Sequence, residues 1–552
     1  MRIVVILGLF ALISRGEDVI PYPRKGVENV LVLVNINSSM SRHIADYYIK
    51  ARNIPEAHKL ELACDESENI SENDYNTLIL EPLKEFLLEN NLKDSITFIV
   101  LTKGLPIRIK YPSYNRSLCS TLASLWRPAS NRTFNPYFNR SPMGTYRVQP
   151  FFPQLQEIYL VSALDGYQMD EDGDSIPDDV KQLIDNSLKA KPGGLFVLDI
   201  DPSKGGGYKI GNDWMEAAHQ ILTSWGIADT LDTTATFLTG LEDVGGYCSW
   251  GSNDAYDTTH GEPFFRWHPG ALSTTYVSTS ARTFTYPPSY GQSLIADEIH
   301  EGVTGTVGFC NEPYLDAVGR PQLLFPAYLK GLTLGEAFYQ SLRYLNWMNI
   351  VCGDPLCAPY LKRMDAPKGI IASFEGDKLR ISWKPSPDPY WMATVIYQDT
   401  KSPLTPDEAH HIAIIRDTTY LDEDFASRGD TVYYALAYID SAANIGYLSQ
   451  EIKVIKGGVV LKSQTHQPFW EVVPNPFTTV AEIRFFIPSS IPDLSIKVFE
   501  PTGRMVKEFK IEPKPGLNIL RWDGSEMPSG VYILQASIGK ERMSKKVIIL
   551  HR

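Results

Sequence analysis

The spacing of hydrophobic positions changes along the chain, and each change predicts a different kind of structure. From about Val27 to Tyr360, continuous apolar runs alternate with stretches whose apolar residues recur every three or four positions. Val30–Val34 is such a run, typical of a strand covered on both faces. Helical spacing follows at Ile44 and Tyr48. The alternation predicts a three-layer α/β domain with a mainly parallel sheet.

The same pattern predicts further elements downstream. Strands are expected at 95–102, 195–200 and 303–309, and helices after Ser71 and at 180–188, 214–223, 292–300 and 334–345. Two other segments, Gly245–Asp254 and Ala271–Phe284, run from β-like stretches into small polar residues. Because α/β sheets present their chemistry where parallel strands end, these segments mark the predicted functional surface.

In the last third of the chain the helical period gives way to a period of two. Leu379–Trp383 alternates, and Val432, Tyr434 and Leu436 share one face of a later strand. An early core tryptophan and a late tyrosine-rich strand are typical of an immunoglobulin-like sandwich. Over residues 365–456 the order resembles a fibronectin type III domain, a module that spaces or binds.

Residues 466–552 predict a second immunoglobulin-like β-sandwich. Its motifs include Pro474–Phe477, Thr502–Arg504, Ser529–Ile533 and the ending Lys545–Arg552. This succession resembles the C-terminal sorting domain of type IX secretion, and the related domain of flagellar hook-cap proteins. The resemblance implies delivery to the outer cell surface, with the secretion machinery or cell-surface components as partners.

The amino terminus predicts the same destination. Residues 1–16 have a basic start, an apolar run from Ile3 to Ile13 and small residues at Ser14–Gly16, which indicates a secretory signal peptide. A buried first strand is the alternative interpretation. No segment approaches the roughly 20 apolar residues of a membrane-spanning helix. The net charge of -13 offers no basic excess for nucleic acid.

The sequence gives no support for a nucleotide, an organic cofactor or zinc. It contains no phosphate-binding loop, Rossmann fingerprint, nucleophile elbow or H-E-x-x-H pair. Its six cysteines lack metal-ligand spacing. Cys352 and Cys357 could form a disulfide across the intervening turn, and buried free thiols are the other state open to them.

An acidic loop at 170–179 is the candidate calcium site. Carboxylates recur at alternate positions around Gly173, and calcium prefers six to eight oxygen ligands. The loop resembles the acidic loops of thrombospondin type 3 repeats. Its candidate ligands are Asp170, Asp172, Asp174, Asp178 and Asp179. A solvated loop that caps the following helix is the alternative.

Several motifs of the α/β region resemble an uncharacterised family of bacterial exported proteins. These motifs are Leu101–Arg108, Ser249–Asp254, Thr304–Gly308, Asn311–Tyr314 and Cys352–Leu356. The resemblance implies export and assigns no activity.

Residues 25–362 are similar in layout to the caspase–gingipain clan of cysteine peptidases. In that clan one strand ends in His-Gly, and a later strand ends in the nucleophilic cysteine. Here Trp250 precedes Gly251, and the second strand ends in Ser278–Ser280 without a cysteine. The resemblance therefore implies a peptidase-like fold that lacks the clan's dyad.

Replacement nucleophiles stay open, because a thiol or hydroxyl needs only a nearby base. The candidate pairs are Cys248 with His260 or His268, and Ser278 or Ser280 with Asp254 or Glu312.

A polar group at the predicted strand ends is the candidate ligand site. Its members are Ser252, Asn253, Asp254, Arg282 and Glu312. Arg282 and the carboxylates either bind a charged ligand or pair with one another. Two hypotheses follow: a non-catalytic surface protein that binds a ligand or partner, or an exported hydrolase with an unassigned nucleophile.

Overall fold

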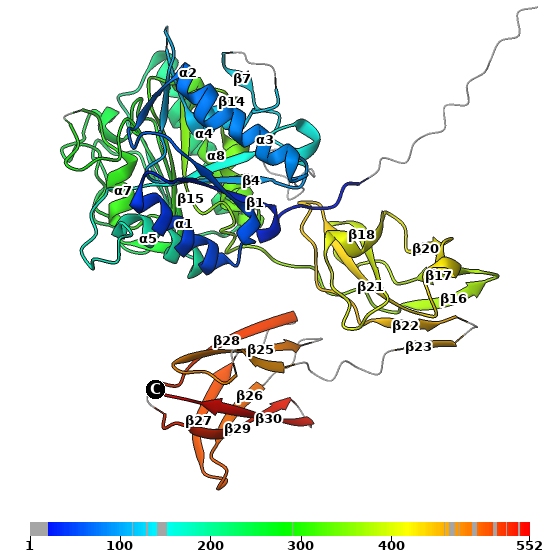
Figure 1. Ribbon diagram of the computed structural model, residues 1–552. Coiled ribbons are helices and arrows are strands. Elements are labelled where there is room, and N and C mark those ends of the chain that lie inside the picture. Colours follow the sequence, from blue (N-terminus) through cyan, green and yellow to red (C-terminus); the bar gives the residue numbers. More distant parts are fainter. Residues whose placement is uncertain are drawn as a thin grey trace, which may run out of the picture. The chain divides into compact units, whose positions relative to one another are not determined.

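The structure is a computed structural model, and the chain divides into two compact units. The α/β unit comprises residues 23–362 with Ser441–Ala443, and the all-β unit takes most of the remainder (Figure 1). The described residues are 20–112, 114–127, 131–140, 152–289, 291–456, 459–462, 470–473, 475–487, 494–511, 516–525, 527–538 and 541–551. The predicted signal peptide lies outside them. None of the helices within these ranges is both long enough and apolar enough to cross a membrane.

A ten-stranded mixed sheet forms the centre of the α/β unit. In spatial order its strands are β10 (Asp229–Asp232), β9 (Leu195–Asp199), β11 (Val244–Ser249), β12 (Trp267–Thr275), β13 (Gly305–Phe309), β15 (Asn349–Gly353), β8 (Leu160–Leu164), β4 (Phe98–Thr102), β1 (Val30–Asn35) and β2 (Lys59–Leu62). From β10 to β13 the neighbours run parallel. β15 runs antiparallel to β13, and β8, β4, β1 and β2 are again parallel to one another.

The carboxyl ends of both parallel groups lie at one edge of the sheet. Lys103, just after β4, donates to the carbonyl oxygen of Phe284 beyond β12 at 3.0 Å. The Arg108 guanidinium likewise donates to the carbonyl oxygen of Cys310, just after β13, at 3.1 Å. This edge is where a parallel sheet presents functional side chains.

Helices cover both faces of the sheet. The Ser273 hydroxyl bonds Glu298 of α7 (Ile295–Glu301), whereas the neighbouring Thr274 hydroxyl bonds the carbonyl oxygen of Gly319, before α8 (Pro321–Leu329). Adjacent strand residues point to opposite faces, so α7 and α8 cover opposite faces. α5 (Asp178–Leu188) packs with α7 and with α1 (Ser39–Arg52). α8 packs against α6 (Lys209–Ser224) and α9 (Leu334–Ser341).

Shorter elements complete the α/β unit. These are α2 (Glu72–Tyr75), which continues through a π-helical segment into α3 (Glu81–Glu89), α4 (Leu118–Leu122), the small sheet of β3 (Asn69–Ser71), β5 (Arg108–Lys110) and β6 (Asn115–Ser117), and the pair β7 (Thr133–Phe134) and β14 (Tyr344–Leu345). The helix predicted at 334–345 ends at Ser341, because Tyr344 and Leu345 pair with β7 instead. Tertiary pairing thus overrides the helical period at its carboxyl end.

The all-β unit contains two sandwiches, each with its own core. The first pairs β16 (Ile371–Glu375), β17 (Lys378–Ser382) and β20 (Thr419–Asp422) in one sheet, and β19 (His411–Ile415), β18 (Trp391–Asp399), β21 (Thr431–Asp440), β22 (Ile452–Ile455) and β23 (Val459–Lys462) in the other. Trp383, Tyr434 and Leu436 are buried between the sheets, as the alternation predicts.

The second sandwich follows in the chain. Its sheets are β24 (Trp470–Val473), β25 (Val480–Ile487) and β28 (Gly516–Asp523), and β27 (Met505–Ile511), β26 (Leu494–Phe499), β29 (Gly530–Ile538) and β30 (Glu541–Ile549). Trp522 and Ile483 from the first sheet pack with Val498 from the second. The exact domain limits 365–456 and 466–552 stay predictions.

One buried carboxylate joins three segments of the α/β unit. Asp354 is fully buried and accepts hydrogen bonds from Tyr48 at 2.7 Å and Ser187 at 2.8 Å. It also pairs with Arg52 at the end of α1. A buried charge held by three donors is stabilising only while all of its partners stay in place.

Asp354→Ala therefore leaves the Arg52 charge without its partner inside the protein. We expect a loss of about 3–5 kcal/mol in the free energy of unfolding, measured by urea denaturation of the α/β unit within the full chain. Asp213→Ala is the matched control, because Asp213 pairs with Lys209 at the surface of α6. Equal effects of the two substitutions would contradict a structural role for the buried network.

Candidate functional site

A cavity of about 530 Å³ opens where β9, β11, β12 and β13 end. Parallel pairing aligns these ends, so the residues that follow each strand meet there. The lining residues are Lys204, Tyr208, Trp250, Asn253, Tyr276, Val277, Ser278, Glu312, Pro313, Tyr314, Leu315 and Val318. Two predicted ligand-site residues, Asn253 and Glu312, and one candidate nucleophile, Ser278, are among them.

Aromatic rings form much of the cavity wall. Trp250 is fixed, since its indole nitrogen donates to Asn212 at 2.7 Å and its ring packs edge-on against Tyr276. Tyr208 and Tyr314 are 61% and 60% exposed. Their rings therefore leave apolar surface that a ligand can cover.

The charged groups of the lining are already positioned by the protein. The Lys204 ammonium lies 5.1 Å from the centre of the Trp250 ring and pairs with Asp201 at 2.9 Å. Glu312 is exposed, and one of its oxygens accepts the backbone N–H of Tyr314 at 3.0 Å. The cavity thus offers one shielded cation and one accessible carboxylate.

The other predicted ligand-site residues secure the surrounding loops. Ser252 accepts the backbone N–H of Ser293 at 2.9 Å. Asp254 is buried, which raises its pKa, and it accepts the backbone N–H of Tyr256 at 2.7 Å.

Arg282 also stabilises a loop rather than facing the cavity lining. It donates to the backbone oxygens of Gln292 and Ser289. Among the described residues no bond joins Arg282 to Asp254 or Glu312, so the sequence-based pairing of these charges is not formed.

Cys248 and His268 do not form a catalytic pair. Cys248 faces Thr274 in the parallel register, and His268 lies six residues earlier on β12. The register shifts between Val244 and Gly246, however, so that Val244 faces Trp267, the neighbour of His268. Four residues of β11 at about 3.3 Å each then separate Cys248 from His268 by about 13 Å, too far for proton transfer. His268 instead pairs with Asp243 at 2.7 Å. His260, the other candidate base, is exposed in the loop between β11 and β12.

The serine candidates are not bonded to their proposed carboxylate bases: Ser278 and Glu312 both line the cavity, but among the described residues no hydrogen bond joins either serine to Glu312 or Asp254. Ser278 lines the cavity, but no histidine belongs to the lining found in the described part of the chain. Ser280 is 1% exposed, and its hydroxyl has no hydrogen-bond partner among the described residues. A serine hydroxyl without an adjacent base is a weak nucleophile.

All six cysteines are free and buried. Cys352 and Cys357 are therefore not joined in this structure. Burial raises the pKa of the Cys248 thiol well above its ordinary value, because the interior disfavours the thiolate. The reactive form of this cysteine is strongly disfavoured.

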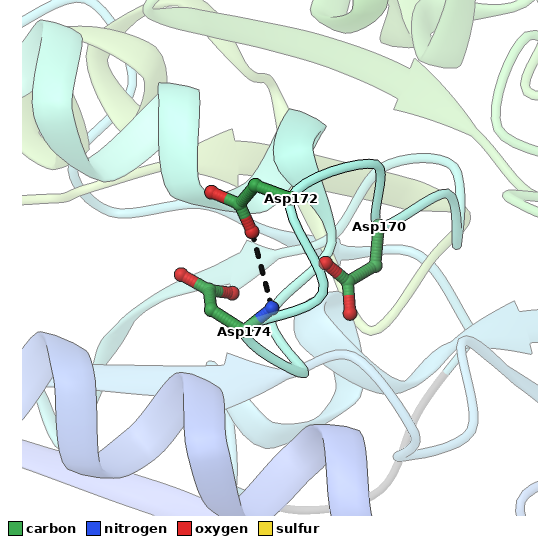
Figure 2. A group of neighbouring side chains, drawn as sticks. All are labelled: Asp170, Asp172 and Asp174. Atoms are coloured by element: carbon green, nitrogen blue, oxygen red, sulfur yellow. Dashed lines mark hydrogen bonds between the residues drawn. The ribbon is translucent and has the colours of Figure 1, made fainter.

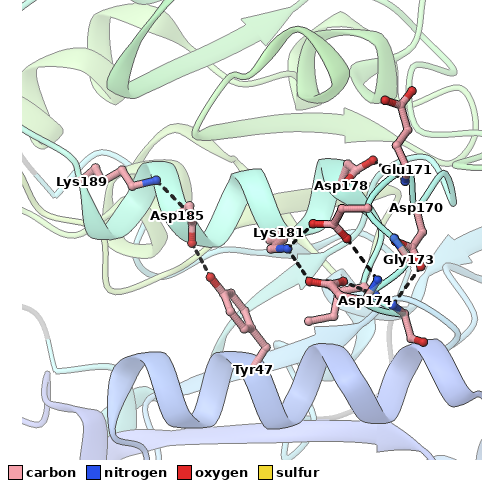
Figure 3. Close-up of polar contacts among 12 residues, drawn as sticks. Tyr47, Asp170, Glu171, Gly173, Asp174, Asp178, Lys181, Asp185 and Lys189 are labelled. Carbon is pink, nitrogen blue, oxygen red and sulfur yellow. Dashed lines mark hydrogen bonds and ion pairs between the residues drawn. The ribbon is translucent and has the colours of Figure 1, made fainter. Parts of the chain in front are cut away.

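Three of the five predicted calcium ligands come together. One carboxylate oxygen each of Asp170, Asp172 and Asp174 lies within 4.8 Å of the others (Figure 2). Lys181 of α5 already pairs with Asp172 and Asp174 (Figure 3). These two carboxylates raise the pKa of Lys181 above its ordinary value.

The remaining two aspartates serve the local fold. Asp178 accepts the backbone N–H of Glu171 at 2.9 Å (Figure 3). Asp179 is buried and accepts the backbone N–H of Tyr167, and its other oxygen contacts His300. The structure therefore narrows the possible calcium ligands to three side chains.

Lys204, Tyr208 and Tyr314 are three polar or aromatic lining residues to which the sequence gave no role. Each follows a strand of the parallel group after a short loop. An aromatic residue shortly after a strand end is the sequence signal that could have identified Tyr208 and Tyr314. Neither Tyr208 nor Tyr314 lies on a periodic element, so periodicity alone gave no reason to select them.

The comparisons with known proteins identify one part of the chain. Residues 471–550 match the family model of the secretion system C-terminal sorting domain. This domain belongs to type IX secretion, so the chain is an exported, cell-surface protein, and the predicted localisation is confirmed. The sorting domain also implies interaction with the secretion machinery. No curated protein sequence matches the chain.

Three solved structures are similar to parts of the chain. An Fn3-like protein from Clostridium thermocellum is 24% identical, with coverage of 16% of this chain and 90% of that chain and a TM-score of 0.14. The chicken interferon gamma receptor alpha chain is 11% identical, with coverage of 33% of this chain and 98% of that chain and a TM-score of 0.13. Dimeric latent PorU from Porphyromonas gingivalis is 13% identical, with coverage of 34% of this chain and 20% of that chain and a TM-score of 0.17. These TM-scores are too low to support an argument about function.

We expect native protein to resist thiol-directed reagents, because every cysteine is buried. Iodoacetamide at neutral pH should leave Cys248 unmodified in the folded full chain and alkylate it in concentrated urea, as measured by mass spectrometry. Rapid alkylation of Cys248 in the native protein, lost after Cys248→Ala, would show an activated thiol and contradict this account.

Proposed function

We propose that this chain is a non-catalytic binding protein of the cell surface, which takes its ligand into the cavity at the strand ends. The observation that carries the proposal is the lining itself. Exposed aromatic rings and a few polar groups converge there, as in ligand pockets. The described lining supplies no histidine or cysteine, so it lacks the base and thiol of a cysteine peptidase.

We further propose that the α/β unit is a peptidase-like scaffold that has lost its reactive pair. Two features support this. β11 and β12 are adjacent and parallel, the arrangement needed to bring two strand-end residues together. Trp250 and Ser278, which stand at those ends, both line the cavity. The strand ends that carry the catalytic pair in a peptidase would then serve as a binding site in this chain.

The exposed rings provide the test of binding. Tyr208→Ala and Tyr314→Ala each remove ring surface from the cavity without opening a buried core, so we expect each to weaken ligand affinity at least about fivefold. The ligand would be found by screening labelled full chain on glycan and peptide arrays, and affinity measured by calorimetry.

Phe264→Ala is the matched control, because Phe264 is 55% exposed and does not line the cavity. Unchanged affinity in both tyrosine variants, or an equal loss in the Phe264 variant, would argue against this binding site. Melting temperatures of all three variants should match that of the unsubstituted protein.

We propose calcium as a ligand of the loop formed by Asp170, Asp172 and Asp174. Hard carboxylate oxygens that converge within 4.8 Å suit this ion. Lys181 neutralises two of them and therefore competes with the cation. Extracellular calcium modules work with dissociation constants on the order of 1 mM, so a weak site of this kind is sufficient.

Removal of the competing ammonium should strengthen the site. We expect Lys181→Met to tighten calcium binding several-fold, and Asp172→Asn to abolish it, in titration calorimetry of the chelator-treated full chain. Lys189→Met is the control, because Lys189 pairs with Asp185 on the same helix (Figure 3). Absence of binding in both the unsubstituted protein and the Lys181 variant would refute the site.

A further inference from the structure

Three arginines contact Asp316 beside the cavity, and a fourth, Arg116, lies nearby on Tyr114, whose ring contacts Trp347. We call Arg116, Arg132, Arg320 and Arg343 the arginine cluster. Arg132 bonds Asp316 at 2.6 Å, and Arg343 lies 3.8 Å from the same carboxylate. Arg320 reaches only the backbone oxygen of Asp316, at 3.5 Å. Burial and the nearby Arg343 charge lower the pKa of Arg320.

Arg116 is the most unusual member. It is 7% exposed, and its guanidinium donates to neutral oxygens only, those of Asn346, Asn131 and Tyr114. Its Nε has no hydrogen-bond partner among the described residues. The group lies 4.3 Å from the centre of the Tyr111 ring. Buried charges are normally paired with an opposite charge, and none of the described carboxylates is bonded to this one.

The surrounding sequence supplies no hidden counter-charge. Residues 95–156, which include Arg116 and Arg132, contain six arginines and two lysines and neither aspartate nor glutamate. The whole chain has a net charge of -13, so this segment is an exception to its composition. Arg132, Arg320 and Arg343 meet at Asp316, and Glu312 is the carboxylate of the cavity lining, so the four arginines of the cluster outnumber these two acidic groups.

The arginine cluster is continuous with the cavity wall. The Trp347 indole nitrogen donates to the carbonyl oxygen of Pro313 at 3.1 Å, and Pro313 lines the cavity. Arg132 lies over the rings of Trp347 and Tyr314, at 5.2 Å and 5.9 Å from their centres. A ligand that covers the exposed Tyr314 ring therefore lies beside the Arg132 guanidinium, the member of the cluster nearest to the lining.

We propose that the ligand is an acidic polysaccharide, whose sugar rings lie against the exposed tyrosines and whose carboxylate or sulfate groups face the arginine cluster. This inference rests on the proposed binding function of the cavity. Guanidinium groups form strong, directional hydrogen bonds with such oxyanions. An extended peptide fits less well, since β11, β12 and β13 are paired on both sides and offer no free strand edge.

The probes are polygalacturonate for carboxylates, dextran sulfate for sulfates, neutral dextran and polyglutamate, each titrated against the full chain. We expect an acidic polysaccharide to bind more tightly than neutral dextran and polyglutamate. The double variant Arg132→Gln/Arg343→Gln should lose at least about tenfold in affinity and show a shallower salt dependence.

Arg127→Gln is the matched control, because Arg127 belongs to the same acid-free segment and donates to the backbone oxygen of Gln156. It should stay within about twofold of the unsubstituted protein. No binding of either acidic polysaccharide, equal loss in the control, or tighter binding of polyglutamate would overturn the inference.

The cavity variants separate this inference from the proposed function. If Tyr314→Ala weakens another ligand while acidic polysaccharides do not bind, only the acidic-polysaccharide inference fails. If acidic polysaccharides bind and Tyr314→Ala and Tyr208→Ala leave every affinity unchanged, the cavity is not the site and both fail.

Discussion

The parallel pairing of β9, β11, β12 and β13 is the constraint on which the candidate site depends. Each strand ends at the same edge, so residues more than a hundred positions apart, such as Lys204 and Glu312, line one cavity. No single segment could assemble this lining. The antiparallel strand β15 then leads to Asp354, whose buried contacts with α1 and α5 hold the opposite edge of the sheet together.

Desolvation is the physical basis of the proposed non-catalytic function. The interior of the sheet strongly disfavours the thiolate of Cys248, and β12 carries His268 about 13 Å from it. At the strand ends the cavity is lined by Trp250 and Ser278, and its described lining holds no histidine or cysteine. The proposal therefore rests on a cavity lining without histidine or cysteine and on a Cys248 thiol that is buried.

Much of the architecture could be predicted because hydrophobic periodicity reports burial directly. The run Val30–Val34 became β1, and the spacing of Ile44 and Tyr48 became the buried face of α1. The two polar segments after β11 and β12 did reach the cavity through Asn253 and Ser278. These features depend on neighbours in the sequence or on the general behaviour of parallel strands.

The remaining features depend on pairings that no local pattern encodes. The carbonyl oxygens that Arg282 contacts are backbone groups, which carry no sequence signature. Lys181 of α5 pairs with Asp172 of the acidic loop, and their spacing in the sequence does not indicate this contact. The arginine cluster draws residues from both ends of the α/β unit, and only the tertiary structure brings Arg116 and Arg343 near Asp316 and Trp347.

The central claim is that the strand-end cavity binds without turnover. The most direct measurement is incubation of the purified full chain with a diverse peptide library, with products analysed by mass spectrometry over a long time course. The account predicts no cleavage above that of the buffer alone. Reproducible cleavage that disappears after Ser278→Ala or Cys248→Ala would contradict it and identify the protein as a hydrolase.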